Sequence, residues 1–164
     1  MNSIKLRGIV MEDFTNYKRP SLFLITSYCD FKCCHEGGFP ESVCQNEPII
    51  KDTNIKAYDI ETIAEAYLSN DITKAIVIGG LEPFLQFEEI KNFIQYLRWD
   101  CDCMDDIVIY TGYYPEEITD QLLSLTKYDN IIVKFGRYIP NSNSRFDPIL
   151  GITLASENQW AEVL

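Results

Sequence analysis

Residues 21–44 read SLFLITSYCDFKCCHEGGFPESVC, and the rest of the fold can be worked out from this stretch. It opens with an apolar run at residues 21–27, of the kind that forms a buried strand. A loop with four cysteines follows, and three of them, Cys29, Cys33 and Cys44, are candidate ligands of an iron–sulfur cluster. An ordinary cluster takes four thiolates, so a cluster on three would keep one iron open to a small molecule.

An open iron is what the radical chemistry of S-adenosylmethionine (SAM) requires, since the cluster must bind that molecule and reduce it. A zinc site is the alternative on the loop alone. Zinc prefers four ligands, and His35 or Cys34 could supply the fourth. Cys34 is the poorer choice, because two adjacent residues such as Cys33 and Cys34 seldom chelate one ion well.

The bulk composition excludes several classes of protein. The chain has 164 residues, enough for one domain with a sizeable core, and we expect a single domain over residues 1–164. Its formal charge is −11, whereas a nucleic-acid binder shows a basic footprint. No apolar run approaches the ~20 residues of a membrane helix. The first residues, MNSIKLRGIVMEDF, are too polar for a signal peptide, so we expect a cytoplasmic protein with neither nucleic-acid nor membrane partners.

The pattern of apolar residues predicts strands that alternate with helices. Residues 28–58 look irregular, because Gly37, Gly38, Pro40 and Pro48 interrupt them. Strands are expected at residues 4–10, 21–27, 74–78, 107–110, 130–135 and 149–154, and helices at 60–68, 87–97 and 115–124, the first capped by Asp59. This alternation indicates an α/β fold with a parallel sheet built from βαβ units.

Three loops follow strands in this pattern, at residues 29–44, 79–83 and 111–113. Ligands gather at the carboxyl ends of parallel strands, so we expect the three loops to meet on one face. Gly79 and Gly80 would let a ligand approach the backbone closely, although a lone Gly-Gly pair is more often an ordinary turn.

Charged and polar residues accompany these loops. Glu82 adds a carboxylate that suits a cation, and Thr111 ends the next strand. Lys134 lies inside the strand IIVKF, where it either binds a ligand carboxylate or points outward. Cys101 and Cys103, in the acidic segment WDCDCMDD, are expected to be surface or edge residues, because two thiols cannot hold a cluster.

Taken together, these segments resemble the activating proteins of anaerobic (class III) ribonucleotide reductases, within the radical SAM superfamily. The likeness runs in order over nearly the whole chain. It is carried by SLFLITSYCDFKC (21–33), VCQN (43–46), VIGGLEPFLQFEE (77–89), VIYTGYYPEEI (108–118), IIVKFGRYIP (131–140) and LASENQ (154–159). Cysteines of that family usually follow a Cys-x3-Cys-x2-Cys spacing. Here Glu36 occupies the third place, Cys44 substitutes after an insertion, and Leu81 interrupts the usual Gly-Gly-Glu-Pro.

The resemblance implies a compact domain built as an open, partial (βα) barrel of mostly parallel strands. It implies a [4Fe–4S] cluster on Cys29, Cys33 and Cys44. It also implies a SAM site that includes Gly79, Gly80, Glu82, Thr111 and Lys134. SAM would be cleaved to methionine and a 5′-deoxyadenosyl radical, which takes a hydrogen atom from a glycine.

The implied partners are the glycyl-radical subunit of an anaerobic ribonucleotide reductase and an electron donor such as flavodoxin or ferredoxin. Two other functions remain open on the sequence. One is a radical SAM enzyme that acts on a small molecule. The other, of a different class, is a zinc-binding interaction module.

Overall fold

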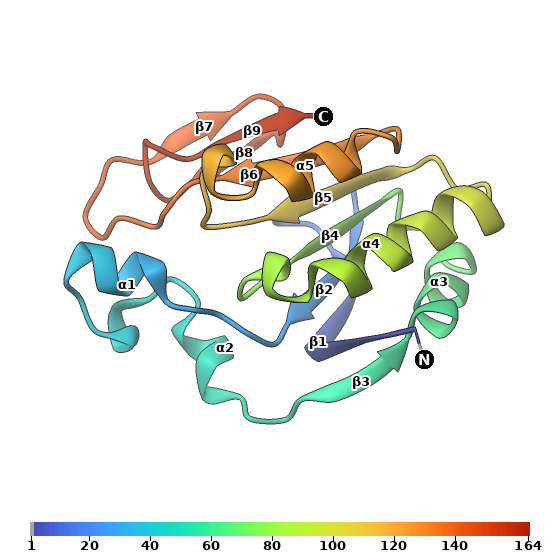
Figure 1. Cartoon of the computed structure of the whole chain (residues 1–164), viewed down its shortest axis with the longest axis horizontal. Helices are drawn as coiled ribbons and strands as arrows, with labels where there is room; N and C mark the ends of the chain where they lie inside the picture. The colour runs from blue at the N-terminus through green and yellow to red at the C-terminus, as the bar shows by residue number, and fades with distance from the viewer. Residues whose placement is uncertain (1) are drawn as a thin grey trace.

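The fold is built on a seven-stranded sheet with the order β3-β1-β2-β4-β5-β6-β9, and a separate hairpin pairs β7 with β8. The structure is a computed structural model, and it describes residues 2–164. Figure 1 shows helices α3, α4 and α5 packed on one face of this sheet, with the β7–β8 hairpin near its β9 end. The strands are β1 (Ser3–Asp13), β2 (Ser21–Thr26), β3 (Lys56–Asp59), β4 (Ala75–Gly80), β5 (Asp106–Tyr110), β6 (Ile131–Phe135), β7 (Arg145–Asp147), β8 (Ile152–Leu154) and β9 (Trp160–Val163).

The four central strands β2, β4, β5 and β6 run parallel, which confirms the predicted α/β fold with a parallel sheet at its centre. The outer strands β1, β3 and β9 pair antiparallel, and the sheet stays open, with β3 and β9 at its two edges. The sequence pattern missed β3, β7 and β9. These strands are three or four residues long, which is too short to show a clear alternation.

The helices are α1 (Lys32–Gly37), α2 (Glu47–Lys51), α3 (Ile60–Leu68), α4 (Phe87–Gln95) and α5 (Thr119–Leu125). A π-helical turn, Tyr96–Asp100, continues α4, and 3₁₀ turns lie at Glu41–Val43, Pro83–Gln86 and Pro115–Glu117. The predicted cap of α3 is confirmed, because the Asp59 side chain accepts the backbone N–H of Glu61 at 2.9 Å. The prediction that residues 28–58 are irregular was wrong. They contain α1, α2 and β3, and helices of five or six residues show no helical period.

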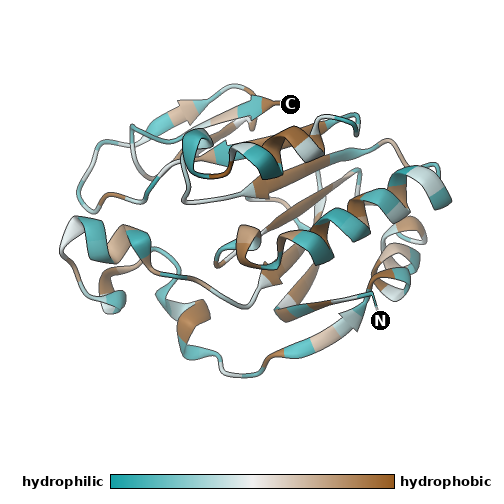
Figure 2. Ribbon diagram, viewed as in Figure 1, coloured by the Kyte–Doolittle hydropathy of each residue, from teal (hydrophilic) through white to brown (hydrophobic). Residues whose placement is uncertain are grey.

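Alternate residues of the central strands pack into two separate hydrophobic cores, one on each face of the sheet. On β4, Ile76 and Ile78 join the larger core beneath the helices, whereas Ala75 and Val77 join a smaller core on the opposite face. Figure 2 shows these strands in brown and the outer surfaces of the helices largely in teal. Because both faces are covered, the central strands are apolar over most of their length, as buried parallel strands are. Among residues 2–164, no helix combines the length and the apolar character that crossing a membrane demands.

The packing of α4 on the sheet gives a test of the larger core. Phe93 is fully buried there, so its replacement by alanine leaves a cavity that the sheet cannot fill. We expect Phe93→Ala to lower the free energy of unfolding by about 3–5 kcal/mol in denaturant titrations. Phe146 is 61% exposed on β7 and is the matched control, since Phe146→Ala removes the same ring from water-facing surface. Equal losses in the two variants would contradict this account of the core.

Candidate functional site

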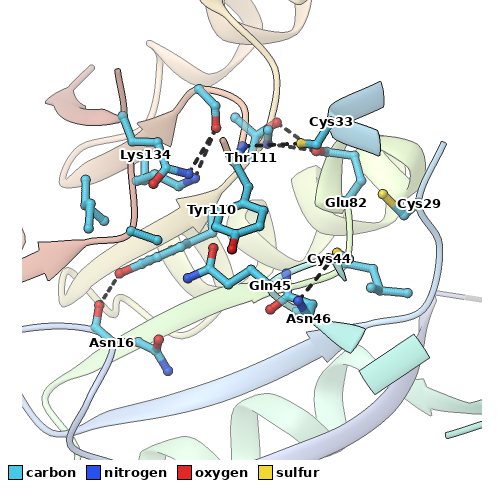
Figure 3. A pocket seen from close by; sticks show the side chains of 18 of the residues that line it. Asn16, Cys29, Cys33, Cys44, Gln45, Asn46, Glu82, Tyr110, Thr111 and Lys134 are labelled. Carbon is cyan, nitrogen blue, oxygen red and sulfur yellow. Dashed lines mark hydrogen bonds between the residues drawn. The ribbon is translucent and has the colours of Figure 1, made fainter. Parts of the chain in front are cut away.

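A pocket of about 320 Å³ opens at the carboxyl ends of the central strands. The three loops predicted to meet do meet there, because each contributes to the lining. Figure 3 shows the labelled side chains converging on this space. The lining includes Cys29, Cys33, Cys34, Cys44, Gly80, Leu81, Glu82, Thr111, Gly112 and Lys134, together with Asn16, Tyr110, Tyr138, Leu154 and Gln159.

Local backbone geometry turns the cysteine segment back over the strand ends. Phe31, just before α1, has a φ of 55°, and Gly38, just after it, has a φ of 67°. The N–H of Gly38 bonds to the carbonyl of Cys34, which closes this short helix. The chain then turns through Glu41–Val43, so that Cys44 returns to the pocket that Cys29 and Cys33 already line.

Three of the four thiols in the pocket accept a backbone N–H. Such hydrogen bonds favour a thiolate and are one of the features that tune the sulfurs of iron–sulfur clusters. The donor–acceptor pairs are Phe31 N with Cys29 Sγ at 3.3 Å, Tyr138 N with Cys33 Sγ at 3.4 Å and Asn46 N with Cys44 Sγ at 3.4 Å. Among the described residues, no backbone amide makes such a bond to Cys34, which is 3% exposed and lies beside Cys44. Backbone donors therefore set Cys34 apart from the other three.

Burial dominates the electrostatics of the thiols. Desolvation raises the pKa of Cys29 to about 12, and the N–H of Phe31 opposes this only in part. Burial also raises the pKa of Cys33, against the lowering effects of the Tyr138 N–H and of Arg137 and Lys134. A metal or cluster that binds these groups must displace their protons, so its binding is coupled to pH.

A single zinc ion is the alternative occupant for these thiols. Within residues 2–164, no three side chains of His, Cys, Asp or Glu lie close enough together to hold one metal ion. A [4Fe–4S] cluster takes each thiolate on a different iron, so its ligands stand farther apart than those of zinc. His35, the other candidate zinc ligand, is exposed on α1 and does not line the pocket. Cys29, Cys33 and Cys44 line one pocket and are the candidate ligands of a cluster.

Glu82 is a buried carboxylate that joins the ends of β4 and β5. The Thr111 hydroxyl donates to its Oε1 at 2.8 Å, and the N–H of Gly112 donates to its Oε2 at 3.0 Å. Burial raises the pKa of Glu82 to about 7, while these donors and the N–H of Phe84 act to lower it. The carboxyl group can therefore change its protonation near neutral pH, at the wall of the pocket.

Lys134 enters the same pocket from β6. It is 7% exposed, so of the two expectations for this lysine the outward orientation is wrong. Its Nζ lies 3.4 Å from the carbonyl oxygen of Gly136 and 5.7 Å from the centre of the Tyr110 ring. Burial lowers the pKa of Lys134 to about 8, opposed by the charges of Glu82 and Cys33. The pocket thus holds a cation that makes few bonds within the protein.

The two glycines differ in place. Gly80 lines the pocket with a φ of 88°, and a Cβ there would come within 2.7 Å of the Ile25 side chain. Gly79 lies inside β4 and outside the pocket lining, where a Cβ would meet Tyr110 at 3.2 Å. Its carbonyl accepts the Thr26 hydroxyl at 2.7 Å. Close packing accounts for Gly79, and Gly80 is the one of the two glycines that faces the pocket.

The positions of two residues could not be predicted from the sequence pattern. Asn16 reaches the pocket from the β1–β2 connection, and no local motif marks it. Cys103 was expected at the surface or an edge, but it is 8% exposed and packs in the larger core. Buried Arg98, in the π-helical turn before it, donates to the carbonyl of Cys103 at 2.6 Å and so fixes the backbone there, while Asp100 and Asp102 on either side stay exposed.

Comparison with known proteins agrees with the chemistry of this pocket. No curated protein and no solved structure matches the chain. A family model described as a 4Fe-4S single cluster domain matches residues 18–159, a span that contains every thiol and every charged group of the pocket. The chain therefore belongs to the family of 4Fe–4S single cluster domains.

Proposed function

We propose that this protein is a radical SAM activase, which cleaves SAM reductively and generates a glycyl radical on an anaerobic ribonucleotide reductase. One observation carries the proposal. Three thiols with backbone N–H donors share a pocket with a buried carboxylate and a buried amine, at the ends of parallel strands. This is the set of groups that a three-ligand cluster and an amino-acid cofactor need together.

In this proposal Cys29, Cys33 and Cys44 hold a [4Fe–4S] cluster. Three ligands leave one iron without a protein side chain, and that vacancy is where SAM would chelate. Cys33 is preferred to Cys34, since Cys33 has the amide donor from Tyr138. When bound, the cluster supplies an electron to SAM, and SAM supplies the radical that abstracts hydrogen.

The charged residues of the pocket complement the two ends of an amino acid. SAM carries a carboxylate, which Lys134 can pair with, and an ammonium and a sulfonium, which suit the Glu82 carboxylate and nearby carbonyls. Gly80 and Thr111 complete this part of the proposed SAM site, and Gly79 supports it from within β4. The work of these residues is to orient SAM and to keep water away from it.

In this proposal the substrate is a protein. Helices α3, α4 and α5 lie on one face of the open sheet, and the cysteine segment and the short β7–β8 hairpin border the pocket. A docking glycyl-radical subunit would close the remaining opening of the pocket. An electron donor such as flavodoxin or ferredoxin would approach the exposed cysteine segment, where His35 and Glu36 face solvent.

The cluster ligands can be tested by colour and iron content. We expect Cys29→Ala, Cys33→Ala and Cys44→Ala each to abolish the brown chromophore of anaerobically reconstituted protein, because each removes one corner of the cluster. Cys34→Ala, Cys101→Ala and Cys103→Ala are the matched controls and should keep it. A colourless Cys34→Ala variant would overturn the choice of Cys33.

The role of Glu82 can be tested by SAM binding. Glu82→Gln keeps the shape of the side chain and removes its charge, so SAM affinity should fall by roughly ten- to a hundredfold, the equivalent of about 1.5–3 kcal/mol for a charged hydrogen bond. Calorimetry of the cluster-loaded protein measures this loss. Glu89→Gln, at an exposed glutamate of α4, is the control. Unchanged affinity in Glu82→Gln would argue against a direct contact.

The activase function itself is tested by electron paramagnetic resonance. The reduced protein, SAM and the reductase encoded alongside it are mixed without oxygen, and a glycine-centred doublet should appear. Omission of SAM, or use of Cys29→Ala, should abolish it. If SAM is cleaved efficiently in the mixture and the doublet never forms, the protein is instead a radical SAM enzyme for a small molecule.

A further inference from the structure

Arg137 lies just beyond β6 and uses its whole hydrogen-bonding capacity. The residue is 6% exposed, and a guanidinium has five N–H donors. All five have acceptors on other segments. Nε and Nη2 donate to the two Glu36 oxygens at 2.9 and 3.0 Å, Nη1 and Nη2 donate to the two Glu117 oxygens at 2.7 and 2.6 Å, and Nη1 also donates to the carbonyl of Gly112.

These acceptors come from separate parts of the chain. Glu36 belongs to α1, the helix that carries Cys33. Glu117 and Gly112 belong to the connection after β5, and Lys32 of α1 reaches the same Glu117 at 3.1 Å. A single side chain therefore ties the cysteine-bearing helix to the ends of two central strands.

The bond to Cys33 depends on this connection. Its amide donor is Tyr138, the residue next to Arg137, which lies 105 positions away from Cys33 in sequence. Helix α1 has only six residues, and a helix of that length needs outside contacts to stay in place. The Arg137–Glu36 pair holds thiol and donor at the distance of 3.4 Å that their bond requires.

The same support extends to the first cysteine. The Arg137 guanidinium lies over the rings of Tyr113 and Tyr114, 5.8 and 5.2 Å from their centres. The Tyr113 hydroxyl donates to Asp30, the neighbour of Cys29, at 2.6 Å. Both ends of the Cys29–Cys33 segment are thus fastened to the group of residues around Arg137.

The carboxylates around Arg137 are held in their charged form. Hydrogen bonds from Arg137 lower the pKa of Glu117 to about 2, and they also lower the pKa of Glu36. Both groups are therefore ionised throughout the neutral range. A planar guanidinium can bind two carboxylates side by side, whereas the single ammonium of a lysine cannot. The site accordingly requires arginine rather than any cation.

We propose that Arg137 is a positioning residue for the iron–sulfur cluster, and that it acts by clamping α1 through Glu36 and Glu117. It supplies no ligand itself. The inference goes beyond the proposed function, because it concerns retention of the cluster and holds whether or not SAM is the substrate. Outer residues that orient the ligands of a metal commonly contribute ten- to a hundredfold to its retention.

The experiment measures the rate at which an iron chelator bleaches the reconstituted holoprotein, without oxygen and well below the unfolding transition. We expect Arg137→Lys to lose iron roughly ten- to a hundredfold faster than the unmodified protein. Its visible spectrum should also change, because the Tyr138–Cys33 bond is disturbed. Glu36→Gln should lose iron faster as well, and combining both substitutions should add little to Arg137→Lys alone, because the two act through one contact.

The matched control is Arg98→Lys. Arg98 is also buried, at 4% exposure, but it donates to the carbonyls of Asp129, Cys103 and Asp105, away from the pocket. This variant should lower the unfolding midpoint and leave the bleaching rate unchanged. If Arg137→Lys does not fold, Glu36→Gln carries the test, because its side chain is 57% exposed. Unmodified bleaching rates in Arg137→Lys and Glu36→Gln, or equal acceleration in Arg98→Lys, would overturn the proposal.

Discussion

The parallel register of the four central strands is the constraint on which the pocket depends. Thr26 of β2 pairs with Gly80 of β4, and Tyr110 of β5 pairs with Lys134 of β6, so these strands end near one another. Each loop that leaves this edge starts close to the next. Residues more than a hundred positions apart in sequence are thus brought together by the arrangement of the parallel strands alone.

Burial shifts the pKa values of the ionisable side chains in the pocket. A carboxylate, an amine and thiols are costly to place in one water-poor space, and Glu82 and Lys134 respond with pKa values displaced towards neutrality. A bound ligand can offset this desolvation free energy by replacing the lost water. Shifted pKa values are therefore common at functional sites. The hydrogen bonds from Thr111 and Gly112 hold the Glu82 carboxylate at the wall of the pocket.

Much of this arrangement could be predicted from the sequence, because its elements carry local signals. The apolar runs of β4 and β6 and the capped helix α3 fall where the pattern expects them. The meeting of the three loops followed from the βα order alone. What the sequence could not supply depends on contacts that no local pattern reveals: β3 forms by pairing with the distant strand β1, and the carbonyl of Cys103 accepts a hydrogen bond from Arg98, a residue of the π-helical turn.

The long sequence separation between Cys33 and its amide donor also affects when the site can form during synthesis of the chain. The donor belongs to Tyr138, so a growing chain on the ribosome exposes every cysteine of the pocket long before that donor has been synthesised. Up to that point the Cys33 thiol lacks its donor, whereas Cys29 and Cys44 have theirs from the neighbouring residues Phe31 and Asn46. Iron delivered to the nascent chain would meet an incomplete site, because the full set of donors to the thiols exists only after β6 and the turn that follows it have been made.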